Sequence, residues 1–217
     1  MRAHRPTEYR GTLLGSVPHI CFYRERSMPF RKFFWKEKTI MRKATHSLSL
    51  RQLTETALLS AVLCVLSPIA IPIGTIPISL GLLGVLIAAV LLPPRQSLTA
   101  VAVFLALGLC GIPVFGGGLG GAVALTGPTG GYLWAYLIVA PLVGILCRVL
   151  RQNPCFVFLA CVCGILVCYI CGTLQYCLIT RTPPLPATIV CVLPFIPFDL
   201  LKAILATYLS HRLKPFL

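Results

Sequence analysis

The stretch that decides the fold is residues 155–179, CFVFLACVCGILVCYICGTLQYCLI, in which 25 consecutive residues carry no charged side chain. The hydrocarbon core of a bilayer is about 30 Å thick, and a helix needs about 20 apolar residues to cross it. A water-soluble domain would have to bury this whole segment. We therefore expect residues 155–179 to form a membrane-spanning helix.

Further apolar segments along the chain approach the length of a membrane span. The predicted fold class is an all-α integral membrane protein, a compact bundle of six transmembrane helices. A Gly-rich extracellular loop would connect the third and fourth helices. The five additional segments are residues 53–71, 76–92, 97–112, 131–150 and 195–213.

The composition of the chain agrees with a membrane protein. Of the 217 residues, 57% are hydrophobic and only 11% are charged, with a formal net charge of +14. Soluble globular domains have about 25% charged residues. The composition therefore argues against a soluble enzyme, a disordered protein and a nucleic-acid-binding protein.

The basic residues predict the orientation in the membrane. Residues 1–51 carry most of the 19 Lys and Arg residues of the chain. If this segment is cytoplasmic, six spans leave only Arg181 on the outer side, as the positive-inside rule requires. We therefore expect a multi-pass protein of the cell membrane with both termini in the cytoplasm. The other basic residues placed on the cytoplasmic side are Arg95, Arg148, Arg151, Arg212 and Lys214.

Residues 1–51 differ from the rest of the chain because they lack a sustained apolar period. We expect a basic, disordered N-terminal extension there, followed by the membrane domain at residues 52–217. Met28 and Met41 are alternative translation starts. The alternative for the extension is a juxtamembrane arm that binds anionic lipids.

The cysteines predict packing rather than metal binding. Ten of the 11 lie in or beside apolar runs, where Cys behaves as a small hydrophobic residue. Cys168 and Cys171 have the spacing of metal ligands, but no second pair or nearby His completes a site. The sequence also contains no Gly-Lys pair, which a Walker-type ATP loop requires. We expect no metal site and no cofactor.

The connection between the third and fourth segments is unusually rich in glycine. It contains GIPVFGGGLGG at residues 111–121 and LTGPTGGY at residues 125–132. Glycine adopts positive φ readily and lets the backbone approach a ligand closely. Because the loop is long and apolar, we expect a lid or pocket wall over an outward-facing site. The alternative is a flexible link between two helices.

The last segment contains two charged residues within an apolar run. In PFIPFDLLK, residues 194–202, Asp199 and Lys202 are three residues apart and share one helical face. Pro197 suits the first helical turn, which places Asp199 near the positive end of the helix dipole. Ionisable residues inside a membrane are costly and mark functional sites. The alternative is a structural ion pair, although a buried pair adds little net stability.

The first segment contains a pair of small residues at helical spacing. Ala57 and Ala61 lie four residues apart, an arrangement that allows another helix to approach closely. The pattern is common in membrane helices and is a weak signal by itself. The alternative is packing within the bundle.

Three blocks of sequence together resemble the BioY family, the biotin-specific substrate-capturing (S) subunits of energy-coupling factor (ECF) transporters. The blocks are IPIGTIPISL at residues 71–80, the glycine-rich connection at residues 111–132, and PFIPFDLLKA at residues 194–203. The resemblance runs from about residue 53 to residue 215. It implies a six-helix bundle with an outward-facing cavity that captures biotin outside the cell and releases it inside.

The resemblance also implies roles for individual residues. Asp199 would accept hydrogen bonds from the ureido N–H groups of biotin, and Lys202 would donate one to the ureido carbonyl. Tyr132 would stack on the ring or hydrogen-bond to it, and the glycine backbone would close over the carboxylate tail. The expected biotin-binding residues are Asp199, Lys202, Tyr132, Thr129, Gly130, Gly117 and Gln175.

The same resemblance implies a transport subunit rather than an enzyme. It would work with a transmembrane coupling protein and two ABC-type ATPases, and its expected partner interface is Ala57, Ala61 and Arg95. The sequence departs from the family pattern in three places. Gly81-Leu82 stand where Gln-Thr is frequent, and Phe198 stands where a Gly is frequent. The loop that usually reads Gly-Pro-Arg reads Pro94-Arg95 without the Gly, so Arg95 is retained.

Two other functions stay open from the residues alone. An S subunit for another vitamin would share the fold and differ in its pocket. A secondary transporter would use Asp199 to couple transport to protons. A membrane enzyme is not expected, because the spans contain no cluster of His or carboxylate side chains.

Overall fold

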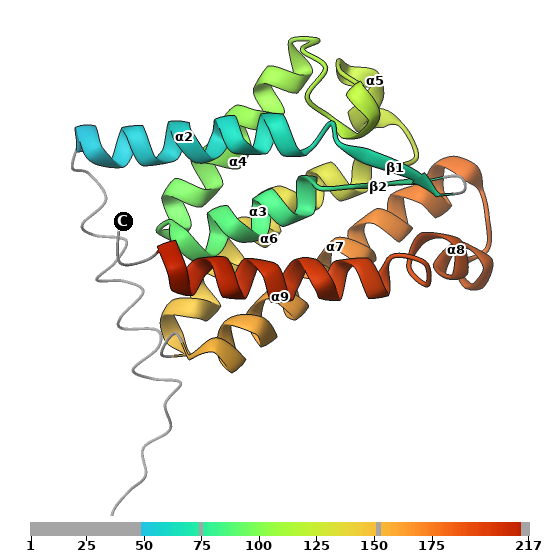
Figure 1. The fold of residues 1–217 in the computed structure, drawn as a ribbon. Helices are drawn as coiled ribbons and strands as arrows, with labels where there is room; N and C mark the ends of the chain where they lie inside the picture. Colours follow the sequence, from blue (N-terminus) through green and yellow to red (C-terminus); the bar gives the residue numbers. More distant parts are fainter. Residues whose placement is uncertain (1–48, 74–75, 151–152, 214–217) are drawn as a thin grey trace, which may run out of the picture. The chain divides into compact units, whose positions relative to one another are not determined.

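The computed structural model describes residues 49–73, 76–150 and 153–213, which belong to the compact unit Leu48–Leu217. Nearly all of the expected N-terminal extension at residues 1–51 lies outside these residues and stays a prediction. The described part of the chain is mostly helical (Figure 1).

Six of the helices follow the order of the six expected segments. They are α2 (Leu50–Leu66), α3 (Gly81–Leu91), α4 (Pro94–Leu109), α6 (Gly130–Val149), α7 (Pro154–Thr180) and α9 (Ile196–Leu213). Shorter elements lie between them: the 3-10 turn η1 (Gly116–Gly118), α5 (Ala122–Thr126) and α8 (Pro184–Cys191). The short helix α8 was not expected, and it begins at the prolines that follow α7.

Over the described ranges, only α6 and α7 are individually long and apolar enough to cross a membrane. Helices α8 and α9 meet the same criterion as a pair that is bent by 51°. Helices α3 and α4 are apolar but shorter. The apolar helices agree with a membrane protein, whereas the count of six spans and the cytoplasmic location of both termini stay predictions.

The segment between α2 and α3 differs from the expectation. Helix α2 ends at Leu66, and strand β1 (Ala70–Ile73) pairs antiparallel with β2 (Ile76–Ser79). The all-α prediction is therefore wrong here, as is the expectation of helix up to residue 71 and from residue 76. The reason is local. The segment PIAIPIGTIPIS alternates prolines, which disfavour a helix interior, with β-branched isoleucines, which favour strands.

Helix α3 lies at the centre of the fold. Every residue from 81 to 90 is buried, and the helix packs against α2, α6 and α9 (Figure 1). A helix that is hydrophobic on all sides is typical of a protein core. The short length of α3 therefore suits a central element whose partners surround it.

Helix α7 has an inner face and an outer face. Cys161, Gly164 and Cys168 lie on the inner face and are buried, which confirms packing as the environment of these free thiols. The outer face exposes large apolar side chains, which suits contact with lipid tails and would be unfavourable in water. These side chains are Leu159, Leu166, Ile170, Leu174 and Leu178.

Candidate functional site

A cavity of about 400 Å³ lies among β2, the glycine-rich connection, and helices α6, α7 and α9. Small-molecule sites in proteins usually measure about 300–1,000 Å³. Most of the lining side chains are apolar, and a few polar ones converge at one end. The lining residues are Pro77, Ser79, Leu82, Phe115, Gly116, Leu119, Gly120, Val123, Ala124, Gly127, Pro128, Thr129, Tyr132, Leu133, Tyr136, Cys168, Tyr169, Phe195, Asp199 and Lys202.

The polar end of the cavity, called the floor here, is built around Asp199 and Lys202 of α9. The Lys202 ammonium donates to Asp199 Oδ1 at 2.7 Å and to the backbone carbonyl of Ser79 at 2.8 Å. The Tyr169 hydroxyl of α7 donates to Asp199 Oδ2 at 2.7 Å. Asp199 and Lys202 are only 3% and 7% exposed. The floor therefore joins α9 to β2 and α7 through charge-assisted hydrogen bonds.

The floor keeps hydrogen-bonding capacity for a ligand. An ammonium carries three N–H groups, and Lys202 uses two of them on Asp199 and Ser79. The carboxylate of Asp199 has further lone pairs beyond those engaged by Lys202 and Tyr169. Asp199 also lies in the first turn of α9, where the helix dipole stabilises a negative charge. The pair is electrically neutral as a unit and still offers both a donor and acceptors.

The glycine-rich connection forms another part of the cavity wall. Phe115 anchors it, because its buried ring packs edge-on against Phe104 at 5.5 Å between centroids. The absence of a side chain at Gly108 makes room for the same ring. Gly117 adopts a φ of 75°, which glycine tolerates best. The Phe104–Phe115 ring contact therefore fixes one end of the connection, and Gly117 allows the backbone to turn there.

Gln175 of α7 holds the other end of the connection. Its side-chain amide donates to the carbonyls of Leu125 and Gly127, both at 2.9 Å. A side chain at Gly130 would collide with this amide and with Leu125. Gln175 thus ties the end of α5 to α7 rather than lining the cavity.

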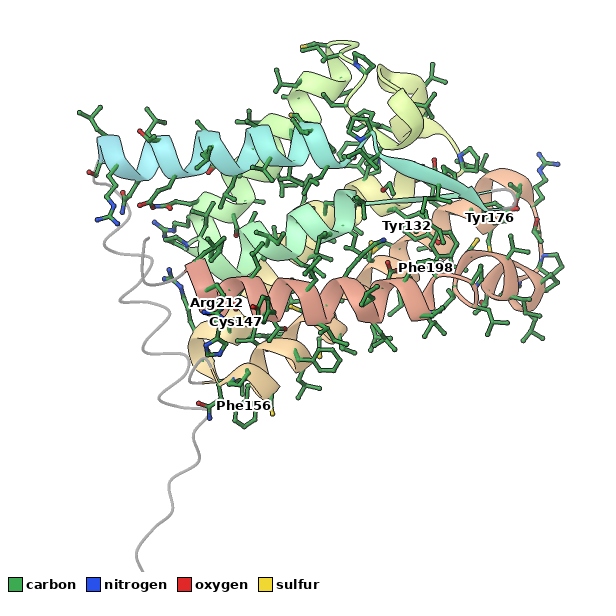
Figure 2. The ribbon with its side chains drawn as sticks, viewed as in Figure 1. Tyr132, Cys147, Phe156, Tyr176, Phe198 and Arg212 are labelled. Carbon is green, nitrogen blue, oxygen red and sulfur yellow. The ribbon has the colours of Figure 1, made fainter. Side chains whose placement is uncertain are left out.

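Two glycines bring α6 and α7 together beside the cavity. A side chain at Gly131 would meet the backbone of Cys171, and one at Gly172 would meet the ring of Tyr132. The Tyr132 hydroxyl donates to the carbonyl of Cys191 at 2.9 Å, which connects α6 to α8 (Figure 2). Tyr132 is therefore held in place by Gly172 at its ring and by the carbonyl of Cys191 at its hydroxyl.

The BioY family model matches residues 41–217 of the chain. The chain belongs to the BioY family. It is 37% identical over 175 residues to the biotin transporter BioY2 of Lactococcus lactis subsp. cremoris, covering 77% of this chain and 96% of that one. It is 32% identical over 165 residues to the biotin transporter BioY of Thermotoga maritima, covering 76% and 96%.

A solved structure has the same fold as this BioY-family chain. It is the crystal structure of the S-component for biotin from an ECF-type ABC transporter, with a TM-score of 0.72 and 34% sequence identity. The match covers 76% of this chain and 92% of that one. Both the sequence and the fold therefore confirm the family resemblance that the three sequence blocks indicated.

The structure brings four of the seven expected ligand residues of this BioY-family chain to the cavity: Asp199, Lys202, Tyr132 and Thr129. Gly117, Gly130 and Gln175 lie just outside its lining and shape the connection instead. Ala57 and Ala61 are exposed on α2, and Arg95 is exposed in the first turn of α4.

Sequence reasoning missed several lining residues, chiefly Tyr169, Tyr136 and Ser79. Segment 155–179 contains several polar side chains, and the sequence does not distinguish Tyr169 from Thr173 or Tyr176. Ser79 was not predicted because its backbone carbonyl, not its side chain, accepts the bond from Lys202. A backbone contact of this kind does not depend on the residue type, so the sequence does not indicate it.

The structure places two of the three departures from the family pattern. Leu82 lines the cavity as an apolar wall residue, and a side chain at Gly81 would collide with Ser67. Phe198 is exposed on α9 and is not part of the lining (Figure 2). Within the described residues, no three His, Cys, Asp or Glu side chains gather as a metal site.

Proposed function

We propose that this BioY-family protein is the biotin-binding S subunit of an ECF-type transporter for biotin uptake. The observation that carries the proposal is the floor, where Asp199 and Lys202 form a buried neutral pair with unused donor and acceptor capacity. The names of its relatives as biotin transporters, and of the related structure as an S-component for biotin, support the same function.

The ureido ring of biotin complements the floor. It has two N–H donors and one carbonyl acceptor, arranged on one edge of a rigid bicycle. The free lone pairs of Asp199 accept from the N–H groups, and the third N–H of Lys202 donates to the carbonyl. Hydrogen bonds to charged groups contribute about 1.5–3 kcal/mol each. The thiophane ring then packs between Tyr132, Leu82 and Phe195, which line the apolar wall.

The remaining expected residues take supporting roles in this proposal. Thr129 offers a hydroxyl in the cavity wall, and Gly117, Gly130 and Gln175 set the position of the glycine-rich connection. Arrival of biotin from outside is consistent with the location of the cavity beneath this connection. The bound form is carried through the membrane without chemical change.

Energy for transport would come from partner proteins. In this proposal a transmembrane coupling protein contacts the exposed Ala57 and Ala61 of α2 and the exposed Arg95. Two ABC-type ATPases act with it on the cytoplasmic side. Small residues let a partner helix approach closely. This arrangement requires six spans in the cell membrane, with both termini in the cytoplasm.

The test is a binding titration of the purified protein in detergent, by calorimetry or by the fluorescence of Trp134 on α6. We expect tight binding of biotin and none of thiamine or riboflavin. Asp199→Asn should weaken biotin binding at least tenfold. The matched control is Glu55→Gln, which makes the same chemical change on α2, away from the cavity.

Each outcome of the titration decides between functions. Binding of thiamine or riboflavin instead of biotin would make the protein an S subunit for another vitamin. Unchanged biotin affinity in Asp199→Asn would remove Asp199 from the site. Biotin uptake that uncouplers abolish and ATPase subunits do not affect would favour a proton-coupled secondary transporter.

A further inference from the structure

The charges of the cavity determine which part of the ligand can be bound at the floor, an inference that rests on the proposed function. Among the described residues that line the cavity, Lys202 is the single cation and Asp199 the single anion. They bond to each other at 2.7 Å, so the cavity has no surplus positive charge. The tail of biotin, however, ends in a carboxylate.

A carboxylate at the floor would be unfavourable for two reasons. It would lie beside the Asp199 carboxylate, and like charges at short range repel each other in a poorly screened interior. It would also compete with Asp199 for Lys202 and leave one of the two anions buried without a partner. The neutral ring is therefore the part of biotin that suits the floor.

The residues that line the cavity differ in exposure, from buried side chains at the floor to exposed side chains on the glycine-rich connection and α5. Leu119 and Val123, on the glycine-rich connection and α5, are 55% and 80% exposed. Together with the exposed Pro128 they form the rim of the cavity. With the ring at the buried floor, the tail would extend between these exposed side chains, and its carboxylate would reach the surface.

Apart from Asp199 and Lys202, the polar groups that line the cavity are neutral. On the glycine-rich connection they are the backbone of Gly120 and Gly127 and the hydroxyl of Thr129. Neutral N–H and O–H donors bond to both an amide carbonyl and a carboxylate oxygen, and the bond to the carboxylate is about twice as strong. At an exposed rim, where water competes for the same groups, we expect this preference to stay small without an ionic partner.

We propose that the site recognises the fused rings of biotin and not the charge of its tail. The substrate class of the site then includes biotin in amide linkage, such as biotinamide and ε-N-biotinyl-lysine. Modification at the ureido ring, in contrast, should abolish binding.

The test compares dissociation constants of the full-length protein for biotin, biotinamide and biotin methylated on one ureido nitrogen. We expect biotinamide to bind within about tenfold of biotin, and the methylated ring to lose more than about a hundredfold. A larger loss for biotinamide, with tight binding of biotin itself, would overturn this inference and leave the proposed function intact. Absence of biotin binding would overturn both.

A charge added at the rim provides a second readout. Leu119→Lys should raise the affinity for biotin over that for biotinamide by about two- to fivefold, because an exposed ion pair contributes up to about 1 kcal/mol. The matched neutral variant, Leu119→Gln, should leave this ratio unchanged. An unchanged ratio in Leu119→Lys would contradict the exit of the tail at the rim.

Discussion

Two ion pairs in the described part of the chain have almost the same length and very different surroundings. Arg51 and Glu55 of α2 are 2.8 Å apart, with side chains 68% and 20% exposed. Lys202 and Asp199 of α9 are 2.7 Å apart, with side chains 8% and 4% exposed. The first pair is partly hydrated, while the second lies in the wall of a cavity and bonds to two other elements.

The two pairs have similar N–O distances, so their different energetic costs come from burial and not from geometry. An exposed pair contributes about 0–1 kcal/mol and constrains little. A buried pair costs several kcal/mol per ion to desolvate, and its attraction repays this only with good geometry and further hydrogen bonds. The pair on α9 is therefore weak evidence for stability, and the proposed binding of a ligand gives its burial a second reason.

The largest effect should come from removing one partner of the buried pair. Lys202→Met leaves Asp199 buried without a cation, so we expect the free energy of unfolding to fall by about 3–5 kcal/mol. Biotin binding should weaken by more than about a hundredfold. Thermal unfolding in detergent and a biotin titration measure the two effects. An unchanged melting temperature would contradict the burial of the pair.

The double variant Asp199→Leu/Lys202→Met sharpens the same comparison. Replacing both ions by apolar side chains removes the unpaired charge, so stability should return to near that of the unaltered protein. Biotin binding should stay absent. Recovery of binding together with stability would show that the pair has only a structural role.

The next effect concerns the hydroxyl that holds Asp199. Tyr169→Phe removes the bond to Asp199 Oδ2, and a loss of about 1.5 kcal/mol corresponds to about tenfold weaker biotin binding. Tyr176→Phe on the same helix (Figure 2) is the matched control, since Tyr176 is absent from the cavity lining. Equal affinities of the two variants would exclude a positioning role for Tyr169.

A smaller effect should follow from releasing the glycine-rich connection. Gln175→Leu removes both bonds to the carbonyls of Leu125 and Gly127. We expect biotin to dissociate about three- to tenfold faster, with a smaller change in its association rate. Stopped-flow measurements separate the two rates. A change confined to association would argue against Gln175 as an anchor of the connection.

The smallest effect belongs to the exposed pair. Glu55→Gln should change the free energy of unfolding by less than about 0.5 kcal/mol and leave biotin affinity unchanged. The same titration and melting curve provide the measurement. A strong effect on binding would mean that α2 contributes to the site, and it would contradict the assignment of ligand binding to the buried pair alone.

Asp199 and Lys202 were predictable as site residues because charges are rare in the apolar part of the chain. Tyr169 was not predicted, because tyrosine is common in apolar helices and its partner lies 30 residues away. Gln175 was expected to touch the ligand, and the structure places it against the backbone of the connection instead. A polar side chain alone does not reveal which acceptor it will find.

The hairpin was missed for a different reason. Its isoleucines and prolines read as an apolar run, and periodicity does not separate a short strand from the end of a helix. The prolines were the available signal, because each lacks the N–H group that a helix interior requires. The carbonyl of Ser79, which binds Lys202, is in place only because β2 forms there.

The sequence by itself determined the membrane character of the protein, the order of its long helices and the two charged residues of α9, since hydropathy and helical spacing are local properties. Tertiary structure alone decided that Tyr169 and the carbonyl of Ser79 meet this pair, and that Gln175 holds the connection. These contacts join elements far apart in the chain. Packing of the helices around α3, and not any local pattern, brings them within hydrogen-bonding distance.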